Sequence, residues 1–265
     1  MFPLFTDLLP ANASELQRLL HQGLERLFSG LREPVAVADK SYPNLASITI
    51  KLDRAQLRPD PPPPPSVSGK ASPAFIVDRL QLSGADISAG PAALSLRLDA
   101  RAVELQQGRD ANRNVVLLVH RAEDGEVEVS AEKREIENAI AAVATREAGK
   151  HGVAIDQVQL SLNVRGERSV DAEVRLRARK LFFSTVVRIG AKLDLDEQLN
   201  ARLSGLACTG EGAIGALACG GLQPHLQKLD GRSISLMALP LGEVRLRDVR
   251  LSAGDKITVR AQFGC

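Results

Sequence analysis

The chain has 265 residues, enough for one large domain or two modest ones. Its 34 basic and 32 acidic residues nearly cancel, so the overall charge does not indicate a polyanion-binding protein. Aromatic residues make up only 3% of the chain and none is a tryptophan. Because single-stranded nucleic acid is bound on aromatic platforms, we expect no nucleic-acid partner.

An amphipathic helix is expected near the start of the chain. Asn12 or Ser14 can cap it, and Gly30 can end it. Its apolar residues have the spacing of one helix face and are Leu16, Leu19, Leu20, Leu24, Leu27 and Phe28. A helix of this kind must bury that face against another element.

Strands and a proline-rich loop follow this helix. Alternating residues predict strands over 48–52, 75–82, 94–98, 102–105, 115–119 and 127–129. Five consecutive prolines, Pro61–Pro65, lie within the segment 59–69. Proline cannot donate to a strand ladder, so this segment is predicted to be a loop with polyproline character.

The second half begins with another helix, predicted over 133–148 with Ser130 as its cap. Its apolar residues are Ile136, Ile140, Val143 and Ala144. Strands are expected over 153–164, 169–182, 185–195, 198–206, 234–237, 244–251 and 257–263. A third helix over 211–229 has a glycine-rich start and contains Pro224; its inward residues are expected to be Ile214, Leu217, Ala218, Leu222, Leu226 and Leu229.

Strict alternation is the strongest signal in these later strands. From Val170 to Ala178 every second residue is apolar, and the residues between them are charged. Side chains of a strand point alternately to opposite faces, so this pattern predicts one wet face and one dry face. We therefore predict an α+β fold in which a long, strongly curved antiparallel sheet wraps around amphipathic helices. Two helix-plus-strands units, 1–129 and 130–265, would form one continuous fold.

The sequence shows no pattern of catalytic or metal-binding residues. Cys208, Cys219 and Cys265 are too few and too widely spaced to predict a disulfide framework or a zinc site. Known hydrolase and metal motifs are missing, so we expect no catalytic residue, metal or cofactor. No segment approaches the ~20 apolar residues of a membrane-spanning helix. The expected location is cytoplasmic with membrane association, or periplasmic if an export signal has been removed.

Three segments resemble one known family. They are SAEKREIENAIAAVATREAGKHGV (130–153), VDAEVRLRARKLFF (170–183) and ISLMALPLGEVRLRDVRLSAGDKITVRAQ (234–262). Together they resemble the bacterial LmeA-like phospholipid-binding family of the tubular lipid-binding (TULIP-type) superfamily. The resemblance implies a half-tube whose hydrophobic channel holds acyl chains and needs no catalytic group. It therefore implies non-enzymatic binding, and by extension transfer, of a phospholipid or another long-chain amphiphile.

Strand parity identifies the residues that would line such a groove. They are Ile155, Val158, Leu160, Leu162, Val174, Leu176, Ile189, Leu193, Leu203, Leu246, Val259 and Phe263. The spacing from Ile155 to Val158 breaks parity and predicts a bulge at 156–157. Two alternatives remain: a structural or protein-interaction module whose core is filled by its own helices, and a hydrolase acting on lipid, for which no nucleophile can be nominated.

Contacts with a membrane surface are expected at three places. Phe2 and Phe5 belong to an apolar N-terminal segment that would either plug one end of the tube or anchor it to a bilayer. Phe182 and Phe183 lie together at an expected hairpin tip. Arg175 and Arg177 point outward from the same strand, where they could contact anionic headgroups.

Overall fold

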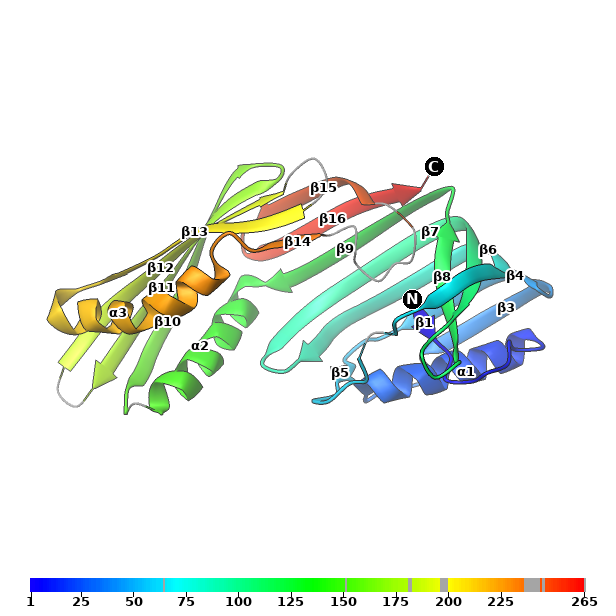
Figure 1. Ribbon diagram of the computed structural model, residues 1–265, viewed down its shortest axis with the longest axis horizontal. Helices are drawn as coiled ribbons and strands as arrows, with labels where there is room; N and C mark the ends of the chain where they lie inside the picture. The colour runs from blue at the N-terminus through cyan, green and yellow to red at the C-terminus, as the bar shows by residue number, and fades with distance from the viewer. Residues whose placement is uncertain are drawn as a thin grey trace.

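The computed structural model describes residues 1–63, 65–150, 152–180, 183–195, 200–235, 244 and 246–264. Within these residues the chain forms two β-sheets and three helices (Figure 1). The molecule is elongated: helix α1 (Ala13–Leu27) lies towards one end, and α2 (Lys133–Gly149) and α3 (Gly212–Leu229) lie towards the other. The predicted α+β class is therefore confirmed, with two sheets in place of one.

The larger sheet has eleven strands among the described residues. They are β1 (Phe2–Pro3), β2 (Phe28–Ser29), β3 (Val35–Ser41), β4 (Asn44–Lys51), β5 (Gln56–Leu57), β6 (Ser68–Ala89), β7 (Ala92–Arg109), β8 (Val115–Arg121), β9 (Asp124–Glu132), β15 (Leu246–Ala253) and β16 (Lys256–Gly264). Its main path runs β15–β16–β9–β7–β6–β4–β3. The prediction that all strands pair antiparallel is wrong here, because β4 and β6 are parallel. The long proline-rich connection between them carries the chain back to the same end of the sheet.

The smaller sheet is an antiparallel meander. Its strands, in spatial order, are β10 (Ala154–Gly166), β11 (Ser169–Lys180), β12 (Phe183–Leu195), β13 (Asn200–Gly210) and β14 (Ser233–Ser235). The register of β10 against β11 shifts between Ile155 and Gln157, so the predicted bulge is confirmed.

The last two strands return to the larger sheet. Strand β16 pairs with β9 along its whole length, and β15 pairs with β16. We expected these strands to belong with the second unit, 130–265, but their partners lie in the first. A backbone hydrogen bond from the Leu251 N–H to the Glu167 carbonyl, 2.9 Å long, joins β15 to the turn after β10.

Helix α1 closes the core of the larger sheet. The Asn12 side chain caps it by accepting a 2.9 Å hydrogen bond from the Glu15 N–H, as predicted. Leu16, Leu20 and Leu24 on its inner face are at most 8% exposed. The hollow left between this helix and the strands measures about 10 Å³, so the core is filled.

Four similar steps interrupt the alternation in or beside the larger sheet's strands. In each, two exposed residues separate two buried ones: Leu52–Ala55, Gly84–Ile87, Ala100–Val103 and Leu246–Val249. The second exposed residue has positive φ in every case, as at Ala102, where φ is 46°. The predicted separate strands 94–98 and 102–105 are therefore wrong: they form one strand, β7, that contains such a step.

In each sheet, a helix side chain accepts a hydrogen bond from the backbone of an edge strand. The Val37 N–H on β3 donates to Gln17 Oε1 of α1 at 3.1 Å. The Leu160 N–H on β10 donates to Glu137 Oε1 of α2 at 2.8 Å. The predicted cap of α2 itself is wrong: Ser130 is buried in β9, and the helix starts after Glu132 with no side-chain cap.

Candidate functional site

The predicted dry face exists on the smaller sheet. Directly opposed residues in antiparallel strands point to the same face, and Val174 lies opposite both Leu160 and Ile189. By this register nine predicted lining residues share one face, which we call the inner face: Ile155, Val158, Leu160, Leu162, Val174, Leu176, Ile189, Leu193 and Leu203. Arg175 and Arg177 are exposed on the opposite face, so the predicted strand register is correct.

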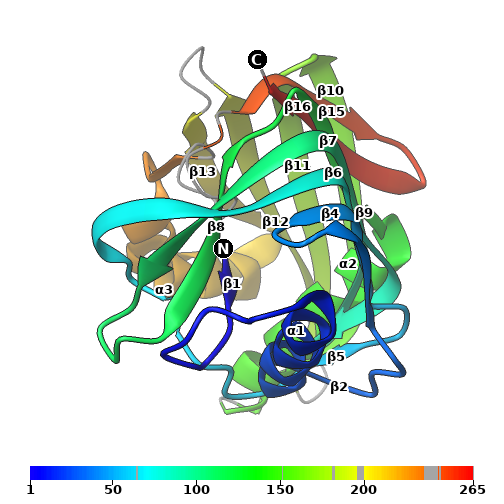
Figure 2. The same ribbon diagram turned by 90° about the vertical axis from the view of Figure 1, so that its right-hand side faces the viewer.

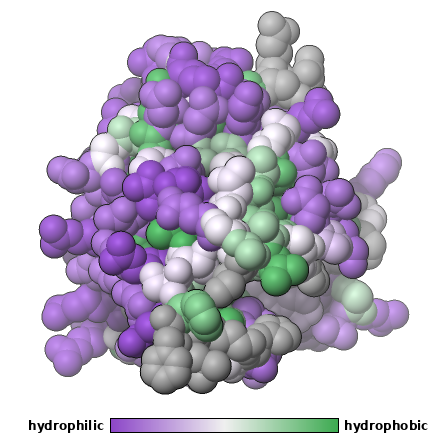
Figure 3. Space-filling view, turned by 90° about the vertical axis from the view of Figure 1, so that its left-hand side faces the viewer, coloured by the Kyte–Doolittle hydropathy of each residue, from purple (hydrophilic) through white to green (hydrophobic). Residues whose placement is uncertain are grey.

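The helices cover the inner face only in part. Helix α2 packs on β10 and α3 on β12 and β13, which leaves β11 between them (Figure 2). Of these nine residues only Leu160 is buried, at 5% exposure, and the other eight are half-buried. Val170, Ala178 and Val187 share this face by the same register, and they are buried as well. None of the seventeen residues of α2, all of them described, is buried. Figure 3 shows a band of apolar residues running between hydrophilic flanks at this end of the molecule.

Helix α3 turns a different side towards the sheet from the one predicted. Its buried residues are Gly215, Cys219 and Leu226, whereas Leu217 is 78% exposed and Leu229 is 42% exposed. A Cβ atom on Gly215 would lie 2.6 Å from the Gly210 carbonyl carbon, so the glycine pair permits close contact between helix and strand. Ala218 is also exposed, Leu222 is half-buried, and the Ile214 side chain lies outside the described set.

A disulfide joins Cys208 on β13 to Cys219 on α3, with 5.4 Å between the two Cα atoms. The sequence predicted no disulfide framework, and this single bond was not foreseen. The return of α3 onto β13 brings together two cysteines that are separated by eleven positions. Cys208 lies opposite Ile189, so the bond reaches α3 from the inner face. Cys219 falls on a helical stripe with Leu222 and Leu226, which was the available sequence signal.

Three predicted lining residues lie elsewhere. Leu246 and Phe263 oppose each other on β15 and β16 of the larger sheet, where they are 6% and 2% exposed. Val259, also on β16, is half-buried against the same core. A Cβ atom on Gly125 would lie 2.3 Å from the Phe263 ring, so the ring packs directly on the β9 backbone. The structure therefore does not bring these three residues to the inner face.

The predicted membrane-contact residues occupy different environments. Phe2 is half-buried in β1, opposite Leu117 of β8. The Arg26 guanidinium stacks over the Phe5 ring, 4.1 Å from its centroid. The first contact docks the N-terminal segment onto the larger sheet, and the second docks it onto α1. Phe183 is 61% exposed at the start of β12, and Phe182 lies outside the described residues.

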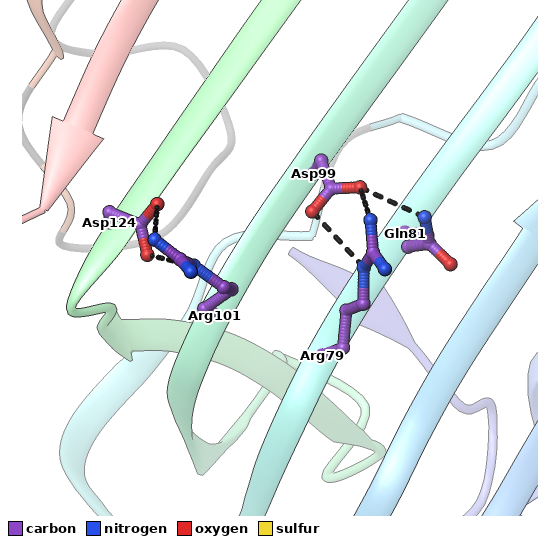
Figure 4. A network of polar contacts seen from close by, with 5 residues as sticks. All are labelled: Arg79, Gln81, Asp99, Arg101 and Asp124. Carbon is purple, nitrogen blue, oxygen red and sulfur yellow. Dashed lines mark hydrogen bonds and ion pairs between the residues drawn. The ribbon is translucent and has the colours of Figure 1, made fainter.

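A second candidate surface, not predicted from the sequence, is the charged outer face of the larger sheet (Figure 4). Arg79 Nη2 donates to Asp99 Oδ2 at 2.7 Å, and Arg101 Nε donates to Asp124 Oδ1 at 2.8 Å. These hydrogen bonds hold the pKa of each carboxyl below its usual range. The hollow here measures about 520 Å³, and its charges are largely paired with one another.

Small residues leave a further hollow of about 400 Å³ across β10 to β13. Its lining includes Ala172, Ala191, Gly190 and Gly205, together with polar neighbours such as Lys192. In the described part of the chain no group of three His, Cys, Asp or Glu residues could hold a metal ion. Nor does any described helix have the length and apolar character needed to cross a bilayer.

The chain was compared with protein-family models, with curated proteins and with solved structures, and none of them matched.

Proposed function

We propose that the protein binds a phospholipid or another long-chain amphiphile on the inner face, between α2 and α3, without catalysing a reaction. The observation that carries this proposal is the incomplete burial of the inner face. Eight large apolar side chains there remain half-buried, although two helices lie on the same side of the sheet. A protein that buried this face for stability alone would fill it, as α1 does on the larger sheet.

The dimensions support an acyl chain as the occupant. The half-buried part of the apolar row along β11 runs from Ala172 to Leu176, roughly 13 Å at about 3.3 Å per residue, because Val170 and Ala178 at its ends are buried. One leaflet of a bilayer provides about 15 Å for its acyl chains, half of the ~30 Å hydrocarbon core. Each methylene buried contributes about 0.8 kcal/mol, so a dozen contribute about 10 kcal/mol before ordering costs.

The disulfide favours one of the two expected compartments. Cys208 and Cys219 would stay reduced in a cytosol buffered by glutathione and thioredoxin. We therefore propose an oxidising compartment such as the periplasm, where an amphiphile carrier would move lipid between membranes.

A second candidate function rests on the larger sheet. Its core is filled by α1 and its outer face carries paired charges, as in a module that displays a surface to another protein. This arrangement matches the filled-core alternative for one half of the molecule. For the smaller sheet the same alternative would require a partner protein to cover the inner face.

The decisive test measures lipid on the purified protein. The protein is incubated with vesicles of phosphatidylcholine and phosphatidylglycerol, separated by flotation, and analysed by native mass spectrometry. We expect stoichiometric phospholipid on the wild-type chain. Leu176→Gln should bind about tenfold less, because a buried leucine contributes about 1.5–3 kcal/mol.

Glu173→Gln is the matched control, since it introduces the same side chain three positions away on the opposite face of β11. It should bind lipid like the wild type. Thermal unfolding of both variants establishes that they remain folded. A folded wild-type chain that carries no lipid and takes none from vesicles contradicts the proposal, and so does equal binding by the two variants.

A further inference from the structure

Helix α3 is poorly suited to remain helical by itself. It contains Gly215, Gly220, Gly221 and Pro224 within eighteen residues. Each interior glycine costs a helix about 1 kcal/mol relative to alanine, and a proline about 3 kcal/mol. Pro224 has no N–H to donate to the Gly220 carbonyl, so the helix is weakest directly after Cys219.

Polar contacts hold α3 at its two ends. At the first end, the Glu211 N–H donates to the Val186 carbonyl at 2.9 Å, and the Thr185 hydroxyl donates to the Glu211 carbonyl at 2.8 Å. At the other end, the Gly231 N–H donates to the Leu203 carbonyl at 2.8 Å. Between these ends only Gly215, Cys219 and Leu226 are buried among the described side chains of the helix.

The disulfide therefore provides the one covalent attachment in the middle of this segment. Cys208 projects from the inner face of β13, and Cys219 is 8% exposed on the underside of α3. The bond crosses the gap between helix and sheet beside Ile189, an inner-face residue. Without it, the described side chains would hold the central turns of α3 through the half-buried Leu222 and through Gly215 and Leu226 on either side.

We propose that α3 is a redox-controlled strap over the inner face: the Cys208–Cys219 disulfide holds it closed, and reduction releases its central turns so that an amphiphile enters and leaves faster. The ligand part of this inference rests on the function proposed above. The switch itself does not, because it concerns how α3 is attached to β13.

The chemistry of the switch is thiol–disulfide exchange with a dithiol reductant. The reductant supplies two electrons and two protons, the S–S bond of Cys208–Cys219 breaks, and two thiols form. The reductant leaves as its own disulfide, so atoms and electrons balance. Cys219 is buried, so the thiolate of the reductant would first attack at Cys208, which is half-buried.

Hydrogen exchange read by mass spectrometry tests the strap directly. Exchange of the amides in Gly212–Leu229 is measured on the full chain with the disulfide intact, after reduction with dithiothreitol, and in the double variant Cys208→Ser, Cys219→Ser. Loss of a ring of this size should raise the opening equilibrium of α3 about 100-fold. Helix α1, far from the disulfide, is the internal control and should keep its protection. In parallel, the release rate of a fluorescent fatty acid is measured in each state.

Faster exchange confined to α3, together with faster release of the fatty acid, supports the proposal. Unchanged exchange in α3 overturns it, and so does a loss of protection in α1 as well as α3, because the disulfide would then stabilise the whole fold. Faster exchange with an unchanged release rate overturns the gating role. If α3 loosens on reduction but neither state binds the fatty acid, the strap stands and the proposed lipid binding fails.

Discussion

Leu16 on α1 and Ile140 on α2 hold similar places, since each lies on the apolar stripe of a helix that covers a sheet. Leu16 is fully buried, whereas Ile140 is half-buried. The same difference separates the strands beneath them: Ile48 and Leu80 are 2% exposed in the larger sheet, but Val174 and Ile189 remain half-buried in the smaller. One sheet is closed by its helix, and the apolar face of the other is covered only in part.

Truncation of one apolar side chain in each of the two helices should give the largest contrast in stability. We expect Leu16→Ala to lower the free energy of unfolding by about 3 kcal/mol, because it leaves a cavity in a filled core. Ile140→Ala should cost about 1 kcal/mol, since part of that side chain already contacts water. Urea denaturation of both variants provides the comparison. Equal losses would mean that α2 packs as tightly as α1, and the distinction between the sheets would fail.

Glycine positions test the same contrast in the strands. Gly125→Ala should lower stability by about 1–3 kcal/mol, because its Cβ would meet the Phe263 ring. Gly190→Ala on β12 is the matched substitution in the smaller sheet, and nothing lies within 4 Å of its added Cβ. It should change stability by less than about 1 kcal/mol. Stability should rise if the main effect of alanine is to lower the conformational entropy of the unfolded chain. Thermal melts of both variants provide the comparison. Gly190 lies opposite Glu173 on the outer face, and a large loss there would contradict the open space beside its added Cβ.

The smallest expected effect is on the stability of the protein at acidic pH. Arg79 lowers the pKa of Asp99, so the folded chain binds that proton less readily than the unfolded chain does. The stabilisation is therefore complete above the unfolded pKa, near 4, and is lost as the pH falls through the lower folded pKa. Asp99→Asn should remove this component, so its melting temperature should fall less than that of the wild type between about pH 4 and pH 2. Parallel curves for the two proteins would show that the pair contributes nothing.

Local patterns predicted the elements but not their neighbours. Asn12, the leucine stripe of α1 and the alternation along β11 each depend on residues close in sequence, and these predictions are confirmed. Strands β15 and β16 alternate in the same way, but alternation carries no information about which sheet they join. Leu246 and Phe263 were therefore assigned to the inner face, although they lie in the other core.

The remaining errors have specific physical causes. Two exposed residues in succession at Arg101 and Ala102 look like the end of a strand, because a left-handed residue is not visible in an alternation pattern. The rotation of α3 depends on the contact of Gly215 with Gly210 and on the bond of Cys219 to Cys208, and both form only when the helix folds back onto β13. Arg79 and Asp99 are outward charges in the sequence, and only the register shows that they meet.

The edge caps made by Gln17 and Glu137 have a consequence for the behaviour of the protein at high concentration. Neither sheet closes on itself, so both end in strands whose free N–H groups could recruit a strand from another molecule. On β3 and β10, an amide or carboxylate oxygen from the adjacent helix already occupies one of these donors, at Val37 and Leu160. The helices that pack on the two sheets thus also hinder fibril-like pairing of edge strands between molecules. Without these hydrogen bonds, the protein would expose free edge donors in addition to its half-buried apolar face.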